Sequence, residues 1–227
     1  MFAGHIGAAL AIGRAERRIN LGALIFAALF IDFALWLFVL LGWESVFIPA
    51  DFSSTHQPVF DFPYSHSLLA IVAWSVLGGA VVYLWYPHLM EKKFRAAAFV
   101  ALAVFSHWVL DDLVHVAGLP LAGTGSSRIG LGLWQNMPVA LTVEGIILVF
   151  GLGLFLYGSG LTLARKFWLT LLSLVTLAFT VVGMTVAPPP PSVTAMAGSS
   201  LVTVLAVSAL AWWLGRRPHE GQAHQDI

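Results

Sequence analysis

Long apolar stretches recur along the chain, with only short polar connections between them. Six of these stretches are long enough to cross a bilayer, which needs about 20 apolar residues. They cover residues 20–42, 67–86, 96–117, 138–157, 167–187 and 199–215. The opening stretch, residues 2–13, is apolar but too short to span, and we expect a short re-entrant or interfacial helix there. The pattern predicts an all-α fold, a polytopic membrane bundle of about six transmembrane helices.

The composition supports the same class of protein. A mean hydropathy of +0.88, with 59% hydrophobic and only 10% charged residues, leaves too little polar surface for a soluble domain of 227 residues. The formal net charge is zero, which argues against nucleic acid as a partner. The chain has no cysteine, so any metal has to be held by nitrogen and oxygen ligands. We expect one integral membrane domain over residues 1–217 and a short, disordered cytoplasmic tail over residues 218–227.

Lysine and arginine predict the orientation of the spans. Of the 11 basic residues, Arg128 alone lies in a connection on the opposite side from the rest. The others lie in the segments 14–18, 92–95, 165–166 and 216–217. The positive-inside rule makes these segments cytoplasmic, and the C-terminus with them. Outward-facing connections are then expected over residues 43–66, 118–137 and 188–198.

Ionisable residues interrupt the third span. The segment from Ser106 to His115 places His107, Asp111 and His115 four residues apart, so on a helix they form one stripe. An ionisable side chain at membrane depth costs several kcal/mol unless it faces protein, water or a metal. The default interpretation of the stripe is therefore functional.

Helix rise brings further groups to the same depth. At about 1.5 Å per residue, Asp32 lies roughly 18 Å above the cytoplasmic end of its helix, and His107 and Asp111 lie about 16 and 22 Å up theirs. His66 enters from the outer end of the second span, and the opening stretch, folded back, would raise His5 to the level of Asp32. This convergence predicts a metal site held by His5, Asp32, His66, His107 and Asp111. A proton relay or a structural hydrogen-bonded pair is the alternative for His107 and Asp111.

Three nearby groups have other expected roles. Asp112 points about 100° away from Asp111 on the helix, so it would orient a ligand, pair with His115 or accept a proton. His115 itself lies close to the outer surface and is expected as an interfacial polar residue rather than a ligand. Glu144, about two turns from the outer end of the fourth span, is either a general base or the partner of Arg128.

Short motifs along the first 137 residues resemble those of a known family. In order, they are Gly4-His5, Asp32, Tyr64-Ser65-His66-Ser67 and Ser106-His107-x3-Asp111. This pattern is similar to that of the bacterial inner-membrane proteins described as YdjM/YbcI-like membrane-bound metal-dependent hydrolases, and more distantly to that of zinc-dependent phospholipase C relatives. The resemblance implies a bacterial inner-membrane location and carries the five histidines and aspartates over as metal ligands. The family's basic lead-in to its T-H-S element is replaced here by Asp61-Phe62-Pro63-Tyr64.

Together these features predict a membrane-embedded, metal-dependent hydrolase of a lipid or lipid-linked phosphoester or amide at the extracytoplasmic side. Zinc is the expected metal, one ion or two, with iron or manganese as alternatives. Asp112 or Glu144 would accept the proton of the attacking water. The rival hypotheses are a small transporter or a proton- or metal-ion-handling protein, and a non-haem iron oxidase. The sequence does not indicate the oligomeric state.

Overall fold

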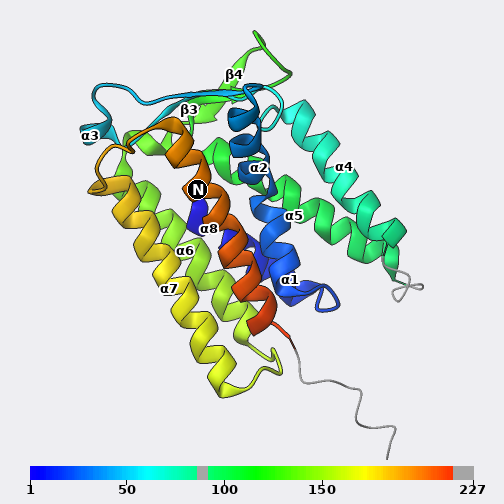
Figure 1. The fold of residues 1–227 in the computed structure, drawn as a ribbon. Coiled ribbons are helices and arrows are strands. Elements are labelled where there is room, and N and C mark those ends of the chain that lie inside the picture. Colours follow the sequence, from blue (N-terminus) through cyan, green and yellow to red (C-terminus); the bar gives the residue numbers. More distant parts are fainter. Residues whose placement is uncertain (86–91, 217–227) are drawn as a thin grey trace, which may run out of the picture.

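The computed structural model describes residues 1–85 and 92–216 and shows an all-α polytopic bundle (Figure 1). Its helices are α1 (Phe2–Ala15), α2 (Leu21–Leu41), α3 (Phe52–Thr55), α4 (Leu68–Trp85), α5 (Lys93–Val114), α6 (Met137–Leu156), α7 (Leu163–Thr185) and α8 (Val193–Leu214). Within the described ranges, six of these helices are long and apolar enough to cross a membrane: α2, α4, α5, α6, α7 and α8. The fold class and the six spans are therefore confirmed, and the chain is a membrane protein by the length and composition of its helices. The predicted tail, residues 218–227, lies outside the described residues.

Polar side chains at the ends of the apolar stretches set where several helices begin. The side chains of Asn20, Asn136, Thr162 and Ser192 each accept a hydrogen bond from a backbone N–H in the first turn of the helix that follows. Such N-caps satisfy donors that have no partner within the helix. The cap at Ser192 starts α8 six residues earlier than hydropathy alone predicts.

The opening helix, α1, lies inside the bundle. It packs most extensively against α6 and also against α2, α5 and α7. Gly7 and Gly151 bring the backbones of α1 and α6 into direct contact, because a Cβ on either glycine would collide with the backbone of the other helix. His5 is consequently fully buried. Of the two placements expected for this segment, the re-entrant one matches the burial.

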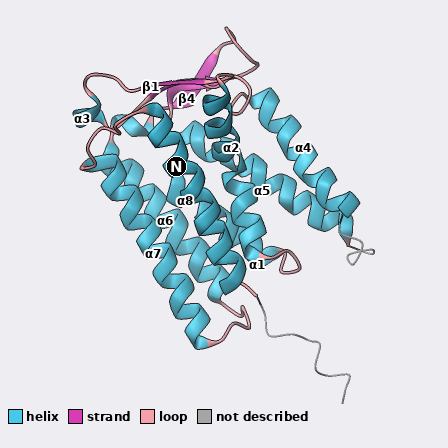
Figure 2. Ribbon diagram, viewed as in Figure 1, coloured by secondary structure: helices cyan, strands magenta, loops and turns pink. Residues whose placement is uncertain are grey.

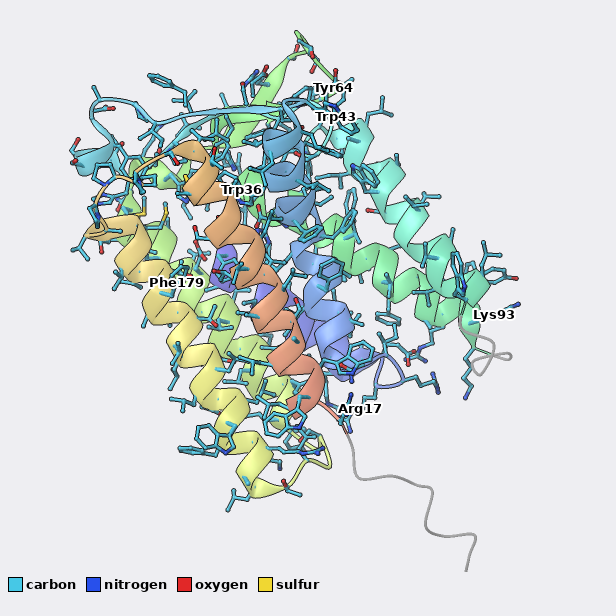
Figure 3. All side chains as sticks on the ribbon, viewed as in Figure 1. Arg17, Trp36, Trp43, Tyr64, Lys93 and Phe179 are labelled. Atoms are coloured by element: carbon cyan, nitrogen blue, oxygen red, sulfur yellow. The ribbon has the colours of Figure 1, made fainter. Side chains whose placement is uncertain are left out.

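Two small antiparallel sheets lie together at one end of the bundle (Figure 2). Strand β1 (Ser45–Phe47) pairs with β2 (Val59–Asp61), and β3 (Val116–Pro120) pairs with β4 (Arg128–Leu131). The third span ends earlier than predicted because its last expected residues belong to β3. The loops that carry the basic clusters lie at the opposite end, as Arg17 and Lys93 illustrate (Figure 3).

Apolar side chains cover the outside of the bundle as well as its interior. The main core joins α1, α2, α5, α6 and α8, and a smaller cluster around Trp36, Phe62 and Leu119 lies beneath the sheets. Large hydrophobic residues such as Val175 and Val202 are more than half exposed on α7 and α8. An apolar exterior of this extent suits contact with lipid chains rather than water.

Candidate metal centre

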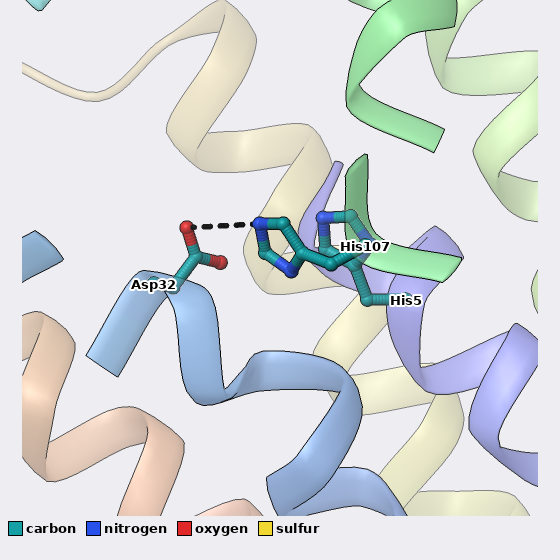
Figure 4. A group of neighbouring side chains, drawn as sticks. All are labelled: His5, Asp32 and His107. Atoms are coloured by element: carbon teal, nitrogen blue, oxygen red, sulfur yellow. Dashed lines mark ion pairs between the residues drawn. The ribbon is translucent and has the colours of Figure 1, made fainter. Parts of the chain in front are cut away.

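The five predicted ligands meet in the interior of the bundle. His5 comes from α1, Asp32 from α2, His66 from the turn before α4, and His107 and Asp111 from successive turns of α5. His5, His66, His107 and Asp111 are buried, whereas Asp32 keeps 25% of its side chain accessible. Figure 4 shows Asp32 facing His107, with the ring of His5 stacked beside it. Four separate segments thus contribute to one cluster.

The donor atoms are spaced as the ligands of a single small ion would be. The Nε2 atoms of His66 and His107 each lie 3.7 Å from Asp32 Oδ1. The same two atoms lie 3.5 and 3.2 Å from Asp111 Oδ2. Tetrahedral zinc bound at its usual distances would separate neighbouring nitrogen and oxygen ligands by about 3.3–3.6 Å. These buried His and Asp groups could therefore hold a metal ion.

His5 approaches the other oxygen of the shared carboxylate. Its Nε2 lies 3.2 Å from Asp111 Oδ1, and its ring stacks on that of His107 with centroids 3.8 Å apart. The Met1 amino nitrogen lies 3.2 Å from the same oxygen. Two groups of three donors each lie close enough to share an ion: His5, Asp32 and His107, and His66, His107 and Asp111.

Several buried ring nitrogens at the site lack a hydrogen bond within the described residues. Both ring nitrogens of His5 and the Nε2 of His107 make no hydrogen bond, although both residues are fully buried. An unsatisfied polar atom in the interior costs about 1–3 kcal/mol. Imidazole nitrogens left bare within a few ångströms of two carboxylates are what a metal site requires, because the ion would satisfy them together.

Hydrogen bonds on the far side of two rings fix which nitrogen faces the cluster. His107 Nδ1 lies 2.7 Å from the carbonyl oxygen of Ala28, a hydrogen bond that requires the proton on Nδ1 and leaves the Nε2 lone pair free. His66 Nδ1 lies 2.8 Å from Ser65 Oγ, and that hydroxyl donates to Glu44 Oε2 at 2.7 Å. Both rings are thereby oriented as metal ligands are in proteins.

Glu44 is a site residue that the sequence analysis did not identify. It is buried, and its other oxygen accepts hydrogen bonds from the backbone N–H groups of Tyr64 and Ser65, each at 2.8 Å. The β1–β2 hairpin makes this possible, because Ser45 pairs with Asp61 and so brings Glu44 beside the turn that carries His66. No local pattern in the sequence signals this contact, since the partners are 20 residues apart.

The expectation that His115 is an interfacial residue is wrong. Its side chain is buried, and its Nε2 lies 3.8 Å from Asp111 Oδ2. Burial lowers the pKa of His115 to about 4, so the imidazole is neutral and its lone pair is available. The signal was present in the sequence, because His115 continues the four-residue stripe of His107 and Asp111.

The two acidic residues expected near the metal ligands, Asp112 and Glu144, make different contacts. Asp112 is half-buried and makes no hydrogen bond or ion pair within the described ranges, and the expected pairing with His115 does not form. Glu144 is buried, and its Oε2 accepts hydrogen bonds from Ala3 N at 3.1 Å and Gly4 N at 3.3 Å. Its carboxylate thus caps α1, two residues from His5. The alternative pairing of Glu144 with Arg128 is wrong, because Arg128 binds Asp61 at 2.8 Å.

A cavity of about 340 Å³ connects this region with the outside of the bundle. Asp32 and Glu144 lie in its wall, together with residues of α7, α8 and the segment 52–60. Phe179, which is 60% exposed, lies at its outer rim on α7, and Trp36 of α2 lines it from the interior (Figure 3). A molecule in the cavity would therefore reach the accessible side of Asp32.

No protein-family model, curated protein or solved structure matches this chain. The function is therefore inferred from the site itself. The structure shows a membrane helix bundle with a buried cluster of histidines and aspartates that could hold a metal, next to a cavity.

Proposed function

We propose that the chain is a membrane-embedded, metal-dependent hydrolase acting on a lipid or lipid-linked substrate at the extracytoplasmic side of a bacterial inner membrane. The observation that carries this proposal is the set of buried imidazole nitrogens that make no hydrogen bond yet lie close to Asp111, next to a cavity lined by α7 and α8. The motif resemblance found in the sequence supports the same class of enzyme and the same membrane. Basic residues at the opposite end of the bundle support the orientation.

Zinc fits the donor set best. His66, His107 and Asp111 would hold one ion, and Asp32 Oδ1 lies 3.7 Å from the Nε2 atoms of both histidines as a further oxygen donor. A zinc ion supplies Lewis acidity that activates water and polarises a carbonyl or phosphoryl oxygen. The second oxygen of Asp111 faces His5, which makes Asp111 the residue able to bridge to a second ion.

Glu144 is the better candidate of the two for accepting a proton. Its carboxylate lies in the cavity wall, and the two N–H groups of α1 that it accepts from hold it in place. A carboxylate held in a fixed position beside the cavity is placed as a general base requires. Asp112 has no contact with the cluster, so we assign it no direct role in the reaction.

Metal-dependent turnover is the test of this function. Protein purified in mild detergent would be stripped of metal with a chelator. It would then be assayed on lipid phosphoesters, esters and amides with the same acyl chains, before and after addition of one equivalent of zinc. We expect turnover of at least one class to be lost on stripping and to return with zinc, but not in His107→Ala. Ser106→Ala is the matched control, because this neighbour of His107 bonds within its own helix, lies outside the described wall of the cavity and should respond to zinc as wild type does.

Other outcomes would contradict the proposal. A protein that binds iron and turns over only with oxygen would be an oxidase. A protein that binds no transition metal, yet moves protons or cations across vesicle membranes in a His107-dependent manner, would be an ion-handling protein. Either result would replace the hydrolase assignment.

A further inference from the structure

The cavity beside the cluster of histidines and aspartates opens between α7 and α8. On α7 its wall includes Phe179 and Thr180, and on α8 it includes Ser199, Ser200 and Thr203. Phe179 and Ser199 are exposed on the outer surface, whereas Thr180 is buried. The opening therefore lies on the apolar exterior of the bundle, where a lipid could reach the cluster without passing through water.

The one amino group in the described cavity wall, that of Met1, is paired with Asp111 and is therefore a poor partner for a phosphate group. Neither lysine nor arginine occurs among the described residues of its wall, which instead contains the carboxyl groups of Asp32 and Glu144. A divalent ion at the cluster and the Met1 amino group would together be balanced by the three carboxyl groups of Asp32, Asp111 and Glu144. An anionic headgroup would thus meet Glu144 with no excess positive charge to offset it, at a depth where charge interactions are strong.

Neutral hydrogen-bonding groups take the place of such a clamp. Ser200 of α8 offers a hydroxyl in the cavity wall. Gln57 adds a side-chain amide, fixed by its bond to the carbonyl oxygen of Trp134 at 3.1 Å. These groups match the hydroxyl and carbonyl oxygens of an uncharged lipid head.

From this charge balance we propose that the α7–α8 cavity binds acyl lipids with an uncharged polar head, of the diacylglycerol type, and discriminates against their phosphorylated counterparts. The inference deepens the proposed function, because it selects carboxylic esters and amides of neutral lipids over phosphoesters as substrates. The discrimination resides in Asp32, Glu144 and the neutral cavity wall, so it should hold with and without the metal.

Binding of two non-hydrolysable lipids tests this inference apart from activity. The protein in phosphatidylcholine nanodiscs would be titrated with tritiated dialkylglycerol, in competition with unlabelled dialkylglycerol or dialkylglycerol phosphate of the same chains. We expect the phosphate to compete at least tenfold more weakly, and Ser200→Arg to reduce that difference to less than threefold. Ser200→Trp should abolish binding by filling the cavity, whereas Val202→Trp on the outer face of α8 should bind as wild type does.

The binding results separate this inference from the hydrolase proposal. Equal or tighter binding of the phosphate, or no saturable binding of either lipid, would overturn it. So would wild-type binding by a folded Ser200→Trp protein, whose fold is checked by its melting temperature. Zinc-dependent turnover combined with a preference for the phosphate would leave the hydrolase standing and refute the neutral-lipid selectivity alone.

Discussion

At the scale of single residues, the chemistry of the cluster is set by which buried polar atoms make no hydrogen bond. The bare nitrogens of His5 and His107 surround Asp111, while Glu144 and Glu44 are engaged with backbone N–H groups. Two kinds of buried carboxylate therefore coexist. Asp111 faces several imidazoles and is suited to bind metal, whereas Glu44 and Glu144 each fix a segment that carries a histidine ligand.

Replacing Asp111 should distinguish a metal site from a proton relay. Asp111→Asn removes the charge that faces four imidazoles, and we expect it to lose the bound metal. Asp112→Asn, the adjacent control that lacks contacts with the cluster, should retain it. Metal content per chain checks both variants, and full metal in Asp111→Asn would favour a buried proton relay.

Glu144 should act in turnover more than in metal binding. Glu144→Gln keeps an oxygen that can accept from α1, so we expect bound metal with turnover lost. Glu144→Ala also removes the cap, and loss of an N-cap costs about 0.5–2 kcal/mol. Zinc content, turnover and melting temperature of the two variants check this, and normal turnover in Glu144→Gln would leave Glu144 a purely structural cap.

The serines that precede two of the ligands should differ in importance. Ser65 connects His66 to Glu44, whereas Ser106 donates to the carbonyl oxygen of Ala103 in its own helix. Because groups that orient a ligand typically contribute 10–100-fold to metal affinity, Ser65→Ala should weaken zinc binding by about that factor. Ser106→Ala is the matched control, and competition with a chelator measures both. Equal affinities would show that Ser65 does not position His66.

At the scale of elements, α1 is the part of the molecule that makes the site possible. This helix is too short to span a membrane, and it brings His5 to the level of α2 and α5 only because α6 supports it. The support is steric: Gly7 and Gly151 let the two backbones touch. Helix association in membranes relies on such small-residue contacts, since lipid chains are as apolar as the side chains they would replace.

A larger residue at this contact should therefore disturb the metal site from a distance. Gly151→Val would push α1 away from α6, and overpacking of this kind typically costs about 1–3 kcal/mol. Gly153→Val, two residues along the same helix with no atom within 4 Å of its Cβ position, should be tolerated. Melting temperature and metal content check the pair. Identical behaviour of the two variants would show that α1 is not held by this contact.

At the scale of the whole molecule, the sequence predicted the features that follow from the length and rise of helices. Uninterrupted apolar length identified the six spans, and a rise of about 1.5 Å per residue placed Asp32, His107 and Asp111 at one level. The sequence could not reveal the role of Glu44, because its contact with Ser65 depends on how the β1–β2 hairpin closes. Nor could it reveal the cap that Glu144 forms on α1. His115 lies at the end of its helix, where depth alone predicts an interfacial position, but the rings of Phe62 and Trp134 pack against its side chain and bury it.

The orientation of the whole molecule can be tested independently of its chemistry. The basic clusters predict that the Arg14–Arg18 segment and the C-terminus are cytoplasmic. A C-terminal reporter that is active only in the cytoplasm should therefore be active, and one that is active only outside should be silent. The reverse pattern would invert the protein and move the metal cluster to the inner half of the membrane.

The central claim is that the buried histidines and aspartates hold a metal ion. Elemental analysis of gently purified protein, beside His107→Ala purified in parallel, tests it most directly. We expect close to one zinc ion per chain in the wild type, or two if Asp111 bridges, and a large loss in the variant. Wild-type protein that is folded, monodisperse and free of any transition metal, even after incubation with zinc, would contradict the claim.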